Sequence, residues 1–218
     1  MFLSDYSHVI FDLDGVLLDT EKLYTEATQR IVGQYGKTFD WSLKSRMMGR
    51  HELEAAELLV QALELPITAE EYLRRSKPIA ESLFPSAAEL PGAEAFVTAL
   101  AERGHVLAVG TSSTREWYEL KTSHLPWFRM FSAVVSGDHP EVRALKPAPD
   151  IFLAAARAVG AAPARCLVIE DSPAGVLAAR AAGMSVVAIP DRALASEPFA
   201  AAQLIVRSYA ELRARLGC

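Results

Sequence analysis

Cysteine, long apolar runs and an excess of basic charge are all lacking in this chain of 218 residues. The two cysteines, Cys166 and Cys218, are too few for a disulfide framework, and no paired Cys/His spacing indicates zinc. No apolar run approaches membrane-spanning length, and the first residues lack the pattern of a signal peptide. We therefore expect a cytoplasmic protein.

The charge balance also bears on the partners. The net charge is −5, and no run of Lys and Arg is interleaved with aromatic residues. Neither nucleic acid nor a membrane is therefore an expected partner. Hydrophobic residues make up 51% of the chain, which is typical of a globular protein with a full core. We expect a monomer that binds a small molecule.

The most informative stretch begins with a short apolar run, Val9 to Phe11, that ends at Asp12. This pattern predicts a buried strand with Asp12 at its carboxyl end. Asp14 projects from the same side of an extended chain, and Gly15 allows a sharp turn after it. Two carboxylates held side by side repel each other unless a cation lies between them. Taken alone, such a tetrapeptide is more often an ordinary turn.

Later in the chain, short apolar runs alternate with helical patterns, which predicts a doubly wound parallel sheet of the Rossmann-like α/β class. The expected strands after the first are residues 106–109, 133–135, 166–169, 185–189 and 204–206. About ninety residues separate the first strand from the second, and their pattern is helical. We expect a core domain formed by residues 1–16 and 87–218, with residues 17–86 as a small inserted helical cap. Within these domains, capping boxes predict helix starts at Thr68 and Ser113.

Polar residues follow several of these strands, and parallel strands bring their carboxyl ends to one edge. Asp12, Asp14 and Asp171 would form a hard, oxygen-lined site that favours Mg²⁺. Glu170 precedes Asp171 and lies beside this site. Each signal has a plainer alternative, because acids near a helix N-terminus are favourable without any ligand.

Three further residues suit an anion at the same edge. Thr111 and Ser112 precede a helix start, where hydroxyl and backbone N–H groups can hold phosphate, although they could be an ordinary cap. Lys146 follows the third strand and could equally be a solvated lysine. Acids, Mg²⁺, an anion cradle and a lysine are the parts that phosphoryl transfer requires. No glycine-rich loop of Walker type is present, so the phosphate is expected to belong to the substrate.

Four segments, in order, resemble the motifs of the haloacid dehalogenase superfamily. They are DLDGVLLDT from Asp12, the Thr111-Ser112 pair, KPAPD from Lys146 and EDSPAG from Glu170. The helical insertion resembles that of the β-phosphoglucomutase-like phosphatases. The pattern departs at Leu145, where glycine is usual, and at Ala148, where aspartate is frequent.

The resemblance implies a catalytic role for each aspartate of the first motif. Asp12 would be the nucleophile that forms an aspartyl-phosphate. Asp14 would protonate the leaving group and then activate water. Thr111 and Ser112 would hold the phosphate, and Lys146 would offset the charge between Asp12 and phosphate.

The resemblance also implies a Mg²⁺ site and a role for the cap. Asp171 would bind Mg²⁺ together with Asp12 and the backbone carbonyl of Asp14. Glu170 would be a nearby ligand, bound directly or through water. The cap would close over the site and select the leaving group.

Further stretches resemble the pseudouridine-5′-phosphatase branch of the family, namely LKSRMMGR, LPGAE, residues 121–123 and GDHPEVRALKPAPDIFLAAA. This likeness implies a sugar or nucleoside monophosphate as substrate, with pseudouridine 5′-phosphate the leading candidate. Tyr24 and Trp41 of the insertion could contact a base, but we interpret both as core residues.

Three alternatives stay open at this stage. A β-phosphoglucomutase-like phosphomutase would use the same residues and return the phosphate to the sugar. A receiver-like signalling module would accept phosphate on aspartate without turnover, although such modules are much shorter. A catalytically silent scaffold would retain the fold alone.

One prediction concerns the expected cap loop around Arg50 and His51, which interrupts the helical pattern. If these residues contact the substrate, Arg50→Ala and His51→Ala should raise KM for the native substrate and leave a small generic ester unaffected. Steady-state kinetics on both substrates measure this. Unchanged kinetics for both would make the loop an ordinary solvated turn.

Overall fold

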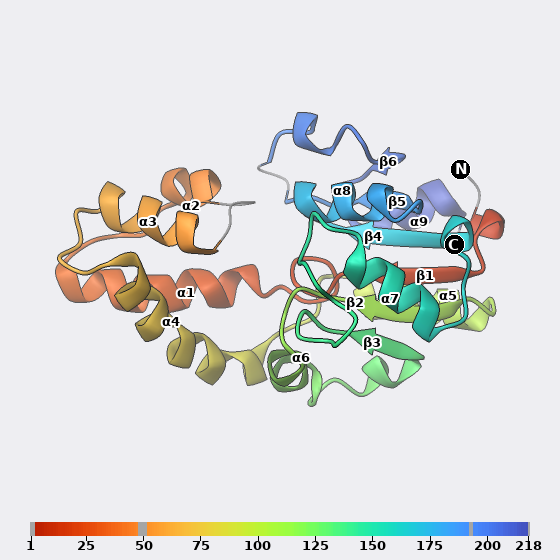
Figure 1. Ribbon diagram of the computed structural model, residues 1–218, viewed down its shortest axis with the longest axis horizontal. Coiled ribbons are helices and arrows are strands. Elements are labelled where there is room, and N and C mark those ends of the chain that lie inside the picture. Colours follow the sequence, from red (N-terminus) through yellow and green to blue (C-terminus); the bar gives the residue numbers. More distant parts are fainter. Residues whose placement is uncertain (1–2, 48–51, 192–193, 218) are drawn as a thin grey trace. The chain divides into compact units, whose positions relative to one another are not determined.

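The computed structural model describes residues 3–47, 52–191 and 194–217 and divides into two compact units (Figure 1). Residues 1–19 and 88–218 form one unit and residues 20–87 the other. The helical unit thus begins at residue 20, three residues after the start expected from the sequence. The reason is that Val16, Leu17 and Leu18 are fully buried in the first unit. There the carbonyl of Leu17 accepts a hydrogen bond from the Leu90 N–H at 2.9 Å.

A six-stranded parallel sheet organises the larger unit, which confirms the predicted Rossmann-like α/β class. The chain passes from β1 outward to β3 on one side and from β4 outward to β6 on the other. The strand order therefore reverses between β1 and β4, and ligands of such sheets bind outside the carboxyl ends at this point. In spatial order the strands are β3 (Ala133–Val135), β2 (Val106–Gly110), β1 (His8–Phe11), β4 (Cys166–Glu170), β5 (Ser185–Ala188) and β6 (Leu204–Ile205).

Helices cover both faces of this sheet, which explains why its strands are continuous apolar runs. On one face, Ile10 belongs to a buried cluster with residues of α7 (Asp150–Ala158) and α8 (Pro173–Ala181). On the other face, the Phe11 ring packs edge-to-face on Phe96 of α5 (Ala93–Glu102), at 6.2 Å between centroids. Phe96 in turn packs on Tyr209 of α9 (Tyr209–Leu216). The sheet is therefore the middle of three layers.

The smaller unit consists of α1 (Glu21–Val32), α2 (Trp41–Met47), α3 (Glu52–Ala62) and α4 (Ala69–Leu83). Its own core includes Ile31, Leu59 and Tyr72, all buried. The Thr68 side chain accepts a hydrogen bond from the Glu71 N–H, so the capping box predicted there is confirmed. In the described ranges, no helix combines the length and apolar character needed to cross a bilayer.

The remaining elements are one helix and several short turns. The helix α6 (Arg115–Thr122) follows β2 and precedes β3 along the chain. Short 3₁₀ helices of three to five residues cover Leu3–Asp5, Gly33–Tyr35, Phe84–Ser86, Pro126–Met130, Pro163–Arg165 and Glu197–Phe199.

Candidate active site

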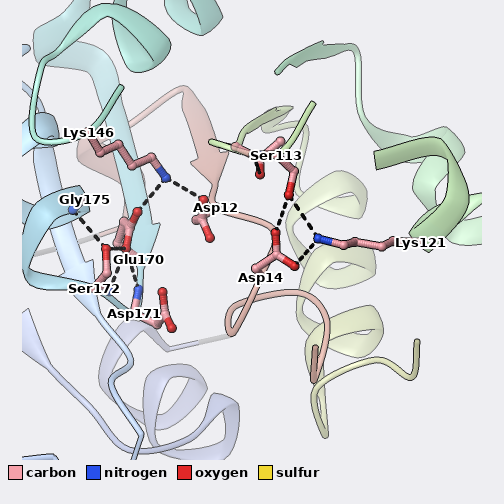
Figure 2. A network of polar contacts seen from close by, with 10 residues as sticks. Asp12, Asp14, Ser113, Lys121, Lys146, Glu170, Asp171, Ser172 and Gly175 are labelled. Carbon is pink, nitrogen blue, oxygen red and sulfur yellow. Dashed lines mark hydrogen bonds and ion pairs between the residues drawn. The ribbon is translucent and has the colours of Figure 1, made fainter. Parts of the chain in front are cut away.

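Asp12 lies directly after β1, where its backbone N–H donates to the carbonyl of Ile169 in β4. Its side chain is buried and accepts a hydrogen bond from Nζ of Lys146 at 2.5 Å (Figure 2). The same Nζ donates to Oε1 of Glu170 at 2.6 Å and lies 4.7 Å from the ring centroid of Phe152. The predicted lysine is thus not a solvated side chain, because it bridges the carboxylates that follow β1 and β4.

Burial and charge shift the titration of this pair. Burial raises the pKa of Asp12 to about 7; the Lys146 charge opposes this rise, and the charges of Glu170 and Asp14 add to it. Burial alone would lower the pKa of Lys146, but the Asp12 and Glu170 carboxylates outweigh that effect and raise it above its usual value. Lys146 therefore stays cationic, while Asp12 needs further positive charge to be fully ionised at neutral pH.

The loop that presents Lys146 is anchored at the start of α7. The Asp150 carboxylate accepts hydrogen bonds from the backbone N–H groups of Arg143 at 2.9 Å and Ala144 at 3.1 Å. Leu145, one of the two departures from the family pattern, is exposed and leaves these contacts in place. The loop therefore holds Lys146 toward Asp12 despite the substitution.

Glu170 ends β4 and is held by the start of α8. Its Oε2 accepts hydrogen bonds from the N–H groups of Asp171 and Ser172, both at 2.8 Å, and from the Ser172 hydroxyl. Ser172 is also the N-cap of α8, because its Oγ accepts from the Gly175 N–H at 3.0 Å. A Cβ on Gly175 would overlap the Glu170 carboxylate. Gly175 is therefore required for this close approach.

Asp171 lies against the turn that carries Asp14. Gly15 adopts a φ of +76°, as its place in a sharp turn predicts, and its N–H donates to the Leu18 carbonyl at 2.9 Å. A Cβ at Gly15 would overlap the carboxylate of Asp171. Asp171, which follows β4, thus packs directly against the turn after β1, and only glycine can occupy position 15 of that turn.

Asp14 has partners of its own on the other side of β1. Its Oδ1 accepts from Nζ of Lys121 at 2.6 Å, and its Oδ2 accepts from the Ser113 hydroxyl at 2.8 Å (Figure 2). Lys121 also donates to Ser113 at 3.0 Å. The prediction that Ser113 caps the next helix was wrong, because Thr114 caps α6 by accepting from the Trp117 N–H. Ser113 is one residue too early for that role and bonds the acid instead.

Thr111 and Ser112 occupy the turn after β2. Thr111 is buried, its N–H donates to the Val135 carbonyl, and its hydroxyl accepts from the Ser113 N–H at 3.1 Å. Ser112 is exposed, and its carbonyl lies where a Cβ on Gly137 would be. The structure thus brings all the site residues predicted in the larger unit to one edge of the sheet. They end or follow the neighbouring strands β3, β2, β1 and β4.

Comparison with known proteins agrees with this arrangement. The model of the haloacid dehalogenase-like hydrolases matches residues 9–189. The chain belongs to this family.

Two named relatives of this hydrolase are phosphatases. A probable pseudouridine-5′-phosphatase of Drosophila melanogaster is 42% identical over 97% of this chain and 93% of its own. The mitochondrial (DL)-glycerol-3-phosphatase 1 of Arabidopsis thaliana is 44% identical over 86% of this chain, but the match spans only 65% of that protein's length. The predicted family and enzyme class, a phosphatase, are confirmed.

Solved structures of the family share the fold. A hydrolase of the family from Deinococcus radiodurans, determined with bound phosphate and sodium, is 25% identical and has a TM-score of 0.83 over 98% of this chain and 96% of its own. A putative β-phosphoglucomutase from Thermotoga maritima is 31% identical and has a TM-score of 0.76 over 92% of this chain and 94% of its own, which supports the predicted branch.

The donor set of this hydrolase fits a hard cation such as Mg²⁺. Among the described residues no group of three His, Cys, Asp or Glu side chains is arranged to hold a metal. The expected site needs only the carboxylates of Asp12 and Asp171 and the carbonyl of Asp14, because Mg²⁺ retains several waters. The packing of Asp171 against Gly15 and the raised pKa of Asp12 are both consistent with a cation there.

The helical unit of the hydrolase can be compared with the predictions only in part. Arg50 and His51 lie outside the described residues. The interpretation of Trp41 as a core residue was wrong, because its side chain is 42% exposed and lines a cavity of about 350 Å³ within this unit. Tyr24 is only partly buried, and its ring packs edge-to-face on Phe84.

Gly175→Ala tests whether the tight packing of Glu170 matters for catalysis. The added methyl group would displace the Glu170 carboxylate and, through it, Lys146, and misplacement by about 1 Å can cost up to 10²-fold in rate. We expect a loss of roughly 10- to 100-fold in hydrolysis of p-nitrophenyl phosphate.

Gly33→Ala is the matched control, because Gly33 has a helical φ of −60° and a Cβ there meets only Gln29 Nε2 at 3.4 Å. It should retain the wild-type rate. A folded Gly175→Ala enzyme with unchanged activity would contradict the role given to this packing.

Proposed function

We propose that this enzyme is a Mg²⁺-dependent phosphatase that hydrolyses a small phosphate monoester through an aspartyl-phosphate on Asp12. One observation carries the proposal. The two aspartates of the turn after β1 have separate cationic partners, Lys146 for Asp12 and Lys121 for Asp14. Two carboxylates two residues apart are thereby set in different environments, as distinct nucleophilic and acid–base roles require.

In the first step the carboxylate of Asp12 attacks phosphorus. The bond from Asp12 to phosphorus forms as the bond from phosphorus to the leaving oxygen breaks, and that oxygen takes a proton from Asp14. Lys146 offsets the negative charge that gathers between Asp12 and the phosphoryl oxygens. The hydroxyl of Thr111, at the end of β2, and the exposed turn at Ser112 bind those oxygens.

In the second step water replaces the enzyme on phosphorus. Asp14, now a carboxylate, takes a proton from the water as its oxygen bonds to phosphorus. The bond between phosphorus and Asp12 breaks, which releases inorganic phosphate and restores both aspartates. A donor near 3 Å from the reacting oxygen is needed in both steps, so the position of Asp14 decides the rate of each.

Mg²⁺ would be held by Asp12, Asp171 and the carbonyl of Asp14, and when bound it neutralises negative charge on the transferring phosphoryl group. Glu170 serves this site through Lys146 and Ser172, whose hydrogen bonds already engage both its oxygens. We therefore assign Glu170 to holding the lysine and to contacting the cation through water.

The helical unit, residues 20–87, is proposed to act as a cap that selects the leaving group. Pseudouridine 5′-phosphate is the leading substrate, because the likeness to the Drosophila relative covers nearly the whole chain. The exposed indole of Trp41 is a surface on which a base can stack. Glycerol phosphate is the second candidate, favoured by the 44% identity to the plant enzyme.

The chemical proposal predicts cation-dependent turnover. Excess EDTA should abolish hydrolysis of p-nitrophenyl phosphate, and Mg²⁺ should restore it, because the acidic site cannot bind a phosphate dianion without a cation. Asp12→Asn should abolish both turnover and the covalent phosphoryl-enzyme, measured by acid-quenched labelling. Full activity after verified removal of metal, or a labelled Asp12→Asn enzyme, would refute the mechanism.

A panel of phosphorylated metabolites tests the substrate, with kcat/KM measured from released phosphate. We expect pseudouridine 5′-phosphate to rank first, and Trp41→Ala to raise its KM without changing that of glycerol 3-phosphate, which has no base to stack. Hexose phosphates at the top of the panel would refute the assignment. Migration of phosphate to another hydroxyl without release would establish a phosphomutase, and phosphorylation without turnover a receiver-like module.

A further inference from the structure

Lys121 is a buried lysine that has no role in the proposed chemical steps. It lies on α6, its side chain is 0% exposed, and its Nζ contacts Oδ1 of Asp14. The ammonium also lies 5.6 Å from the ring centroid of Trp117. Burying a charge is costly unless it is paired, and an apolar side chain of similar size would often serve folding as well or better. Folding alone therefore does not explain a lysine at this position.

The contacts around Asp14 form a closed triangle. Lys121 binds one carboxylate oxygen, Ser113 binds the other, and the ammonium donates to the Ser113 hydroxyl at 3.0 Å. The Asp14 side chain itself is 25% exposed, so one part of it stays open to solvent. Contacts to both oxygens restrict both torsions of a short side chain, and so they define where the open part points.

We propose that Lys121, with Ser113, is a positioning residue that holds the carboxyl group of Asp14 where it can reach the leaving oxygen; this inference rests on the proposed function. The triangle ties Asp14, which follows β1, to the turn after β2 that carries Thr111. The acid is thereby held relative to the loop that binds phosphate. Lys121 acts through Asp14 and touches no substrate.

The first test uses Lys121→Met, which keeps the length of the side chain and removes the ammonium. Proton donation matters most for a poor leaving group. We therefore expect the first step, measured as release of the leaving alcohol in a single turnover, to slow by roughly 10- to 100-fold for the best alkyl phosphate of the panel and by less than about threefold for p-nitrophenyl phosphate. A merely structural role would lower both rates alike, and that result would overturn the proposal.

Two further variants separate the effect from general damage. In an Asp14→Asn enzyme, Lys121→Met should add little further loss on the alkyl phosphate, because both changes remove the same function. Fully multiplied losses in the double variant would overturn the proposal. Glu119→Gln is the control, because it removes an exposed ion pair with Arg115 on the same helix and should leave both rates unchanged.

A second readout does not depend on turnover. Crystal structures of the wild-type enzyme and of Lys121→Met should show Asp14 in one conformer in the first and displaced or in several conformers in the second. An Asp14 side chain unmoved in Lys121→Met would overturn the positioning role. A wild-type enzyme that hydrolyses no phosphate ester would instead refute the proposed function, and the two structures would still decide the position of Asp14.

Discussion

Mutual repulsion among carboxylates is the constraint on which this site depends. Asp12, Asp14, Glu170 and Asp171 converge on the ends of two neighbouring strands. Two buried lysines offset them, so that four negative charges against two positive ones leave an excess of two when all are ionised. Burial is the main cause of the raised pKa of Asp12, and the charges of Glu170 and Asp14 add to it. A divalent cation supplies the missing charge, which is a physical reason for the Mg²⁺ that we propose.

The fold meets this constraint by bringing distant segments close together. In the parallel register, Phe11 lies beside Ile169, so the residues that follow β1 and β4 meet at the point where the strand order reverses. At Gly15 the segment after β1 approaches Asp171 so closely that no side chain fits between them. Within the connection from β4 to α8, Gly175 likewise makes room for Glu170. The spacing of the acids is thus built into the backbone.

Much of this arrangement is predictable from sequence, because buried parallel strands are short apolar runs and the polar residue that ends each run faces the site. Asp12, Thr111 and Glu170 all follow this rule, and Lys146, in the loop between β3 and α7, was indicated by the motif that it begins. Lys121 was not predicted, because a lysine within a polar helix has the pattern of a solvated side chain, and only the fold shows that its side of α6 is buried. Ser113 was misassigned because four successive hydroxyl residues, 111–114, can each cap a helix, and sequence does not select among them. For Trp41, hydrophobicity alone does not distinguish a core position from an exposed one.

The separate environments of the two aspartates explain how one short turn can supply two functions. Asp12 continues a central strand and is fixed by Lys146, which also binds Glu170 of β4, as the proposed nucleophile, which must attack in line, requires. Asp14 lies beyond the strand, more exposed, and is held by groups from the β2 side. The chain leaves for the helical unit after Asp19 and returns at Ala88, and the two residues are hydrogen-bonded at 2.9 Å. Asp14, the proposed acid, must match the leaving group, and it lies a few residues from the connections to the segment proposed to select that group. Asp12, the proposed nucleophile, meets the same phosphoryl group in every substrate and remains on the sheet.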